Sequence, residues 1–330
     1  MIIANRKEAI VRVLFALLFL GLAHPVAAQT DAYPNRPIRI MVTVPPGGAA
    51  DFIARTVGAK LSEAVGQSVL VENRAGASGT IAADAVAKAP PDGYTLLQNS
   101  FTTHGVAPLI YSKLPYDSFR DLAPVTLLTQ IPLIMAVNAE VPAKSAEEFI
   151  ALAKSKPGAF SFCSSGSGGA PHLTGELFKS ETGADLVHVP YKGSGPAVTD
   201  LIAGRVQVMF DGAPSLLAHV KSGKLRVLAA ASRKRNPLAP DAPTFAEIGY
   251  PQIDVSLWYG MMVPAGTPQP VIDRLNREIG KVLALPEIRE RFAAQGAEAT
   301  PTTPEQFAQF MRQELAKWAP VVKRAGVKAD

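Results

Sequence analysis

The chain of 330 residues contains a single cysteine, Cys163. One thiol excludes both an internal disulfide and a metal site built from several cysteines. We therefore expect Cys163 to be a small apolar side chain inside the core. The five histidines are scattered and form no His-Glu-x-x-His pattern, so the sequence predicts no metal site of that kind either.

Strongly charged stretches are also scarce. The formal net charge is +5, and it falls to +3 without the first 28 residues, which hold three basic and one acidic side chain. The longest basic run, Arg233 to Arg235, is expected to form a solvated turn. This distribution predicts no nucleic-acid partner, because binding to nucleic acid requires a basic patch or stripe.

Familiar catalytic motifs are missing as well. No Gly-Lys-Ser/Thr follows the glycines at Gly47, so this loop is not a nucleotide P-loop. Pro171 stands where a dinucleotide fingerprint beginning at Gly166 would need its last glycine. The chain has no Gly-x-Ser-x-Gly elbow and no locally paired carboxylates. We therefore expect no cofactor and no enzymatic activity.

The N-terminal segment is typical of a secretory signal. A basic start is followed by an almost wholly apolar run over 13–22 and a small-residue cleavage pattern at 26–28. The apolar run is too short to span a bilayer comfortably. We predict a signal peptide over 1–28 and a mature start at Gln29, with an uncleaved membrane anchor as the alternative.

Strand and helix patterns alternate along the rest of the chain, which is typical of βα units and largely parallel sheets. In the clearest unit, apolar residues alternate over 38–44 as in a strand, and a Pro-Pro-Gly-Gly turn follows. An amphipathic helix is predicted from Asp51. Free N–H groups at such a turn form a ready anion site, although the pattern also fits an ordinary βα turn without a ligand.

Other segments are predicted in the same way. We expect two apolar strands at 125–129 and 133–137, separated by Pro132, because proline cannot donate to a strand ladder. The stretch 73–76 is expected to be a turn. Thr303 and Gln306 have the spacing of a capping box and predict the start of a C-terminal helix.

Loops rich in Gly, Ser and Thr recur at the ends of the predicted strands. They cover 46–50, 99–103, 164–169 and 191–195. Backbone N–H and hydroxyl donors suit a carboxylate that must be held and released, because each contributes modestly. His172 and Glu176 lie four residues apart and could share a metal, but a capping or ligand-contacting histidine is the favoured interpretation.

Six stretches of the chain together resemble a known family. They read VPPGGAADFIAR, ENRAGASGTIAADAVAKAPPDGYTLL, SGSGGAPHLTGELF, HVPYKGSGPAVTDLIAGRVQVMFD, APTFAEIGYP and WYGMMVPAGTP. This combination resembles the Bug family, the TctC-like periplasmic solute receptors of tripartite tricarboxylate transporters, over essentially the whole mature chain.

The resemblance implies the α/β fold of a type II periplasmic binding protein, which has two domains. Two crossover strands would join these domains, and the ligand cleft would lie between them. Domain I would comprise 29–130 and 257–330, and domain II would comprise 131–256. The resemblance further implies a periplasmic monomer. It would bind a small organic carboxylate (a di- or tricarboxylate, an amino acid or an aromatic acid) and deliver it to the membrane subunits of the transporter.

Ligand-binding positions are carried over from the family's motifs. Loop amides of Gly47, Gly48 and the segment 164–169 would hold one carboxylate, and other side chains would contact the rest of the ligand. The expected set is Gly47, Gly48, Asp51, Asn99, Ser100, Thr102, Ser164, Ser165, Gly168, Gly169, His172, Tyr191, Gly193 and Asp211.

Three positions in this set carry particular expectations. Gly169 stands where the family often has Ser or Thr, which removes a hydroxyl donor, and Ser167 stands where the family often has Asn. Asp51 could cap its helix as well as contact the ligand, and capping is favoured. Asp211, if it faced the cleft, would favour an ammonium or hydroxyl group over a second carboxylate.

Two other functions stay open from the residues alone. The chain could be a sensory partner that docks on a signalling protein when its ligand is bound. It could also be an exported serine hydrolase that uses a loop serine such as Ser164 with His172, although this would need a third group to orient the histidine.

Overall fold

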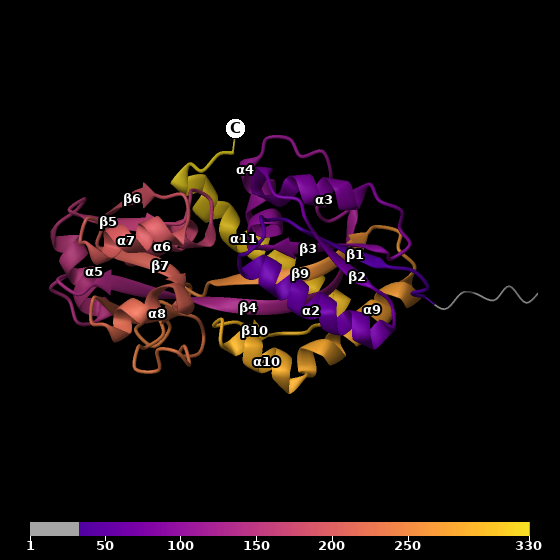
Figure 1. The fold of residues 1–330 in the computed structure, drawn as a ribbon. Coiled ribbons are helices and arrows are strands. Elements are labelled where there is room, and N and C mark those ends of the chain that lie inside the picture. The colour runs from indigo at the N-terminus through magenta and orange to yellow at the C-terminus, as the bar shows by residue number, and fades with distance from the viewer. Residues whose placement is uncertain (1–32, 330) are drawn as a thin grey trace, which may run out of the picture. The chain divides into compact units, whose positions relative to one another are not determined.

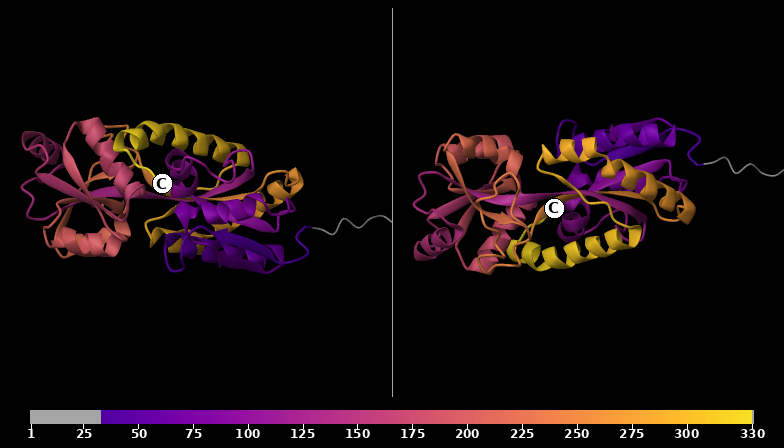
Figure 2. Two further views of the ribbon diagram at one scale, coloured as in Figure 1. Left: turned by 90° about the horizontal axis from the view of Figure 1, so that it is seen from above. Right: turned by 90° about the horizontal axis from the view of Figure 1, so that it is seen from below.

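The computed structural model describes residues 33–329, and Figures 1 and 2 show its ribbon. The predicted signal peptide over 1–28 and the predicted mature start at Gln29 lie outside these residues. Within the described range, no helix has both the length and the apolar character that crossing a membrane requires.

Strands and helices alternate along the described chain, as the sequence pattern predicts. The strands are β1 (Ile38–Val42), β2 (Val69–Asn73), β3 (Thr95–Ser100), β4 (Leu122–Asn138), β5 (Phe160–Ser164), β6 (Leu186–Pro190), β7 (Val208–Gly212), β8 (Leu225–Ala231), β9 (Ser256–Pro264) and β10 (Glu298–Ala299). The α-helices are α2 (Ala49–Val65), α3 (Thr80–Ala87), α4 (Ala107–Ile110), α5 (Ala146–Ser155), α6 (Ala170–Thr182), α7 (Ser194–Ile202), α8 (Ala213–Lys221), α9 (Gln269–Ala284), α10 (Pro286–Ala293) and α11 (Pro304–Ala325). A 3₁₀-helix, η1 (Ala77–Gly79), precedes α3, and a π-helix, η2 (Phe101–Val106), follows β3.

The strands form two parallel groups that meet at two antiparallel strands. The order is β2-β1-β3-β9-β4-β7-β5-β6, and β8 and β10 also pair with β4. β1, β2 and β3 are parallel to one another, as are β5, β6 and β7, whereas β4 and β9 run antiparallel to their neighbours. We call the part built on β1, β2, β3, β9 and β10 lobe I and the part built on β5 to β8 lobe II (Figure 1).

The long strand β4 belongs to both lobes. It pairs with β9 from Leu122 to Pro132 and with β7 and β8 from Leu133 onward. The prediction that Pro132 separates two strands is therefore wrong. Pro132 is the last residue paired with β9, and a residue without an N–H is tolerated where the pairing ends.

The chain passes back to lobe I immediately beside this point. The N–H of Val255 donates to the carbonyl of Ala231 at 2.8 Å, and the carbonyl of Val255 accepts from the N–H of Leu133 at 3.1 Å. β9 then begins at Ser256. The two passages between the lobes are thus hydrogen-bonded to each other.

The predicted strand–turn–helix unit over 38–55 is formed by β1 and α2. Ile38, Ile40 and Val42 are fully buried, and so are the helix residues Val57 and Leu61. The single cysteine, Cys163, is buried as predicted, in a second apolar cluster of lobe II.

The C-terminal helix α11 contacts both lobes. Its predicted start is confirmed, because Thr303 and Gln306 form a complete capping box. The helix packs against β4 and η2 and also reaches α6 of lobe II (Figure 2). Glu314 of α11 accepts hydrogen bonds from the indoles of Trp258 on β9, at 3.0 Å, and of Trp318, at 3.2 Å.

Close packing of β9 against α11 depends on Gly260. A Cβ at this position would lie 2.0 Å from Cζ of Phe307 and 2.8 Å from Oδ1 of Asn99. We expect Gly260→Ala to lower the free energy of unfolding by about 1–3 kcal/mol through overpacking. Urea denaturation measures this change. In the matched control Gly280→Ala on α9, the new Cβ would meet nothing, and stability should rise by up to about 1 kcal/mol. Equal effects of the two substitutions would contradict the packing argument.

Candidate functional site

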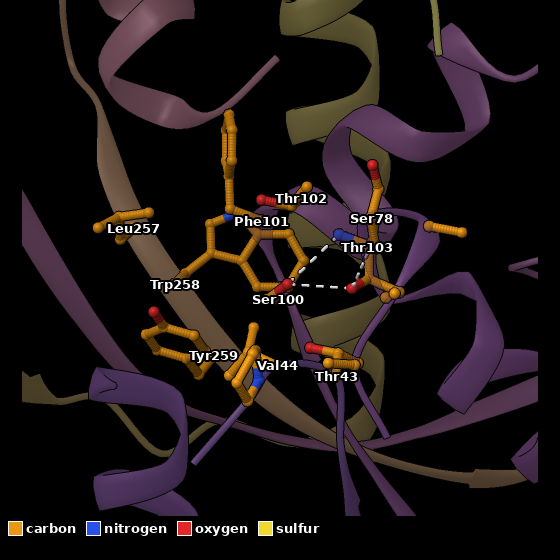
Figure 3. A pocket seen from close by; sticks show the side chains of 15 residues that line it. Thr43, Val44, Ser78, Ser100, Phe101, Thr102, Thr103, Leu257, Trp258 and Tyr259 are labelled. Carbon is orange, nitrogen blue, oxygen red and sulfur yellow. Dashed lines mark hydrogen bonds between the residues drawn. The ribbon is translucent and has the colours of Figure 1, made fainter. Parts of the chain in front are cut away.

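A pocket of about 280 Å³ lies in lobe I beside the start of β9. It is lined by four segments, 43–45, 75–79, 100–103 and 257–259, whose side chains are drawn in Figure 3. None of the fifteen lining residues is charged. A ligand in this pocket would therefore meet dipoles and hydroxyl groups rather than an ion pair.

The loop at one wall of the pocket has an unusual backbone. Four consecutive residues have positive φ: Gly76 at 127°, Ala77 at 46°, Ser78 at 54° and Gly79 at 86°. Ala77 and Ser78 are the only non-glycine residues with positive φ in the described chain. Such strain persists only where the surrounding structure enforces it, and it concentrates at ligand sites.

This loop also offers free donors. The N–H of Gly79 donates to the carbonyl of Gly76, but within residues 33–329 the N–H groups of Ala77 and Ser78 have no hydrogen-bond acceptor. Successive backbone N–H groups in a turn are able to bind an anion together. The two N–H groups of this pocket wall are therefore candidate donors to an anionic ligand.

Hydroxyl groups at the end of β3 and in η2 contact this loop. Ser100 Oγ lies 3.1 Å from Oγ1 of Thr103 and accepts a hydrogen bond from the Thr103 N–H. Thr103 Oγ1 donates to the carbonyl of Ser78 at 3.3 Å, so η2 and η1 hold each other in place (Figure 3). Thr102 also lines the pocket. Single π-helical turns such as η2 are rare and often mark functional sites.

The opposite wall is formed by Leu257, Trp258 and Tyr259 (Figure 3). Burial, with the negative charge of Asp211 adding to it, raises the pKa of the Tyr259 hydroxyl to about 12. This hydroxyl is therefore a neutral donor at neutral pH. The end of β7 and this wall pair with consecutive parts of β4: Asp211 with Ile134 and Leu257 with Ile131.

The predicted Gly47–Gly48 loop lies next to the pocket residues Val44 and Pro45, and Asp51 organises it. The Asp51 carboxylate accepts hydrogen bonds from Arg55 at 3.0 Å, from Asn73 at 2.9 Å and from the N–H of Gly47 at 3.1 Å. These donors, Arg55 first, lower the pKa of Asp51 to about 2. Asp51 thus holds the loop before α2 and pairs the amide of Gly47. The N-cap of α2 is Gly48 and has no side-chain cap hydrogen bond, so the favoured capping role of Asp51 is not confirmed.

In lobe II, the segment 164–169 is held by two stacked histidines. The rings of His172 and His188 lie 3.8 Å apart. Nδ1 of His172 accepts from the N–H of Gly168 at 3.0 Å, and Nε2 of His188 lies 2.7 Å from Oγ of Ser164. His172 therefore holds the loop before α6, although the N-cap Gly169 itself has no side-chain cap hydrogen bond. The histidine that meets Ser164 is His188, not His172 as the hydrolase hypothesis requires, and Ser164 is fully buried.

The remaining predicted positions of lobe II mostly support loops. Tyr191 donates its hydroxyl to Asp200 at 2.7 Å, and the N–H of Gly193 donates to the carbonyl of Ser165. Asp211 accepts from Ser194 Oγ at 2.7 Å and from the N–H of Gly212 at 2.8 Å. Burial raises the pKa of Asp211, while these two hydrogen bonds oppose the rise.

Of the predicted site residues, the pocket contains Ser100 and Thr102. Asn99 lies elsewhere: it is fully buried, and its Nδ2 points to Sδ of Met311 on α11 at 3.4 Å. The sequence analysis missed the loop Ala75–Gly79 and the β9 wall. The only signal for that loop was the pair Gly76 and Gly79, which was interpreted as part of a turn and a helix start.

Comparison with known proteins identifies the chain's relatives. Residues 53–327 match the model of the tripartite tricarboxylate transporter family receptor, TctC. Protein BugT of Bordetella pertussis is 42% identical over 309 residues, which cover 93% of this chain and 94% of BugT. The chain belongs to the TctC (Bug) receptor family.

Solved structures agree with this assignment. One, described as a periplasmic transporter, is 41% identical, covers 91% of this chain and 100% of its own, and superposes with a TM-score of 0.77. An R. palustris protein solved with adipate is 34% identical, and the match covers 90% of this chain and 99% of that protein. Its TM-score is also 0.77. The resemblance seen in the sequence is thus confirmed, as is the fold of a two-domain periplasmic binding protein. This TctC protein belongs among periplasmic solute receptors.

We predict that the stacked pair of His172 and His188 lowers the free energy of unfolding in mild acid. Burial, followed by the effects of His172 and Lys179, lowers the pKa of His188 to about 4. Burial also lowers the pKa of His172, with Lys179 adding to the effect and Glu176 opposing it. The unfolded chain, with histidines near 6.5, then binds more protons than the folded chain, so stability falls as the pH drops below about 6.5.

Denaturation midpoints between pH 7.5 and 5.5 test this. His188→Gln should weaken the dependence of stability on pH, whereas the control His219→Gln on α8 should leave it unchanged. The slope of the denaturation midpoint against pH is compared between variants. Absolute stability is not compared, because His188→Gln also loses the contact with Ser164 and this loss lowers stability at every pH. Identical slopes for His188→Gln and the unchanged chain would refute the prediction.

Gly79 should be essential to the pocket. A Cβ there would lie 2.4 Å from Oγ1 of Thr103 and 2.8 Å from Cβ of Thr43, at a φ of +86°. We expect Gly79→Ala to destabilise the protein by more than about 1 kcal/mol. The control Gly66→Ala also has positive φ, +67°, but meets no neighbour, so the difference between the two denaturation midpoints isolates the crowding. No difference would refute the role given to Gly79.

Proposed function

We propose that this TctC protein binds a small organic carboxylate in the lobe I pocket and delivers it to the membrane subunits of a tripartite tricarboxylate transporter. The observation that carries the proposal is the left-handed loop at the pocket wall, whose Ala77 and Ser78 N–H groups have no acceptor in the described chain. These two donors would hold one carboxylate oxygen each. The hydroxyl of Thr102 lies among the same lining residues.

Neutral donors suit a receptor that must release its ligand. Hydrogen bonds to a charged group contribute about 1.5–3 kcal/mol each, so a few of them bind a carboxylate without a buried counter-charge. Arg55, on α2 behind the Gly47–Gly48 loop, is already paired with Asp51. A carboxylate in this pocket would therefore depend on dipoles, as the Gly- and Ser-rich loops of the sequence suggest.

Lobe II would provide the second half of the site. In this proposal the domains are 29–130 with 257–330, and 131–256, and the ligand closes them by bending at the two adjacent passages near Pro132 and Val255. The amides of Gly48 and Gly169 have no acceptor within the described part of the chain, which makes them the predicted loop donors best suited to contact the ligand. Asp51, His172 and Asp211 would position loops.

The pocket walls favour a ligand with an apolar body. Phe101, Leu257 and Trp258 are among the lining residues, and of these Leu257 is half-buried, so methylene groups or a ring of the ligand would pack against it. Adipate in the R. palustris relative has this character: carboxylates joined by an aliphatic chain. We therefore expect dicarboxylates or aromatic acids rather than strongly hydrated tricarboxylates.

Thermal unfolding against a panel of acids and their matched amides tests the function. A ligand that binds only the folded chain adds about 2.7 kcal/mol of stability at a hundredfold excess over its Kd. We expect one class of acid to raise the Tm and its diamide to have no effect. If no acid raises the Tm and mass spectrometry of the denatured protein finds no retained ligand, the proposal fails.

A pocket variant locates the binding site. Thr102→Val keeps the shape of the side chain but removes its hydroxyl, so we expect affinity for the stabilising acid to fall about five- to tenfold. Thr199→Val, at an exposed position on α7, is the matched control and should bind as the unchanged protein does. Isothermal titration calorimetry measures both. Equal affinities would place the ligand outside this pocket.

A further inference from the structure

A second, larger groove lies where the chain passes between the lobes. We call it the hinge groove; it has a volume of about 1040 Å³ and shares no residue with the pocket. Its floor includes Pro132 and Asp254 from the two passages. One wall comes from lobe I through α10 and α11, and the other is the segment 232–238 that follows β8 of lobe II.

The charges exposed in the hinge groove are mainly positive. Its exposed charged lining residues are Arg233, Lys234, Arg235, Arg289 and Glu298. Arg233 and Arg235 are paired with Asp254 and Glu247, but Lys234 and Arg289 have no ion pair among the described residues. The predicted basic turn is thus exposed, and it forms one wall of a groove.

Apolar side chains accompany these cations. Leu238 is 38% exposed, one of the few large apolar side chains left so open. Phe310 of α11, which is half-buried, lines the same groove. Exposed apolar surface with a charged rim is typical of an interaction site.

A chain of hydrogen bonds holds the groove in shape and links it to the pocket. Lys317 donates to Glu314 at 3.2 Å and to the carbonyl of Asp254, whose carboxylate accepts from Arg233 at 2.9 Å. Glu314 in turn accepts from the indole of Trp258, which lines the pocket. This chain of contacts joins the backbone at Asp254 to α11 and to β9, so the groove and the pocket share a supporting network.

We propose that the hinge groove docks an acidic segment of a partner protein that also carries apolar side chains. Lys234 and Arg289, the two exposed cations of the groove without an ion pair among the described residues, favour carboxylates. Leu238 and Phe310 favour an apolar side chain between them. The proposal rests on the receptor function, since a receptor must meet the component that takes over its ligand. Because the two walls belong to different lobes, such a partner contacts both lobes at once.

Three fluorescein-labelled peptides of twelve residues test the docking by fluorescence anisotropy. One combines Glu and Leu at helical spacing, one combines Lys and Leu in the same pattern, and one replaces Leu by Ser in the acidic peptide. We expect the Glu/Leu peptide to bind at least tenfold more tightly than either of the others, and its binding to weaken as salt is raised.

Charge reversal locates the binding surface. The double variant K234E/R289E should lower the affinity for the Glu/Leu peptide at least tenfold. The control K156E/K221E makes the same change of net charge at exposed sites outside the groove and should leave this affinity unchanged. All four side chains are exposed, so the folds should persist, and circular dichroism checks this. Equal binding of the Glu/Leu and Lys/Leu peptides, or an equal effect of the two double variants, would overturn the proposal.

The acid panel separates this proposal from the receptor function. If the stabilising acid still raises the Tm of K234E/R289E while no peptide binds the unchanged chain, the docking proposal is wrong and the receptor function stands. If the peptide binds as expected but no acid raises the Tm, the hinge groove is a docking site on a protein whose proposed ligand class is wrong.

Discussion

The continuous strand β4, which both lobes share, is the constraint on which the rest of this structure depends. One strand pairs first with β9 and then with β7 and β8, so both lobes share a single backbone. The return passage at Val255 is bonded to the same strand at Leu133. Two adjacent extended segments can bend together but cannot separate, which is the mechanical requirement for lobes that close on a ligand.

The structure treats two of its buried carboxylates and the donors of the pocket loop differently. Away from the pocket, buried charges are satisfied: Asp51 by Arg55 and Asn73, and Glu314 by two indoles and Lys317. At the pocket the pattern reverses, since Ala77 and Ser78 combine strained φ values with N–H groups that have no acceptor in the described chain. Strain and unpaired donors in one loop are expected of a site preorganised for an anion.

Much of the fold could be predicted from local pattern, and the errors have physical causes. The alternation of strands and helices, the burial of Cys163 and the capping box at Thr303 depend on side chains close in sequence, and all are confirmed. The prediction that Pro132 ends a strand was wrong, because a missing N–H is tolerated at the point where a strand changes its pairing partner. Asn99 and Ser100 were both assigned to the ligand, yet successive residues of a strand point to opposite faces, and only Ser100 lines the pocket.

The sequence by itself determined the family, the α/β class and the Gly-rich loops that end the strands, because these depend on residue types at fixed spacing. The tertiary structure alone decided which donors of those loops are paired and which are not. The N–H of Gly47 donates to Asp51, and the N–H of Gly168 donates to His172. The loop at Ala77 is instead held through the carbonyl of Ser78, which accepts from Thr103, 25 residues away in sequence. The conformation of a donor loop depends on packing between segments distant in sequence, so no local pattern could reveal it.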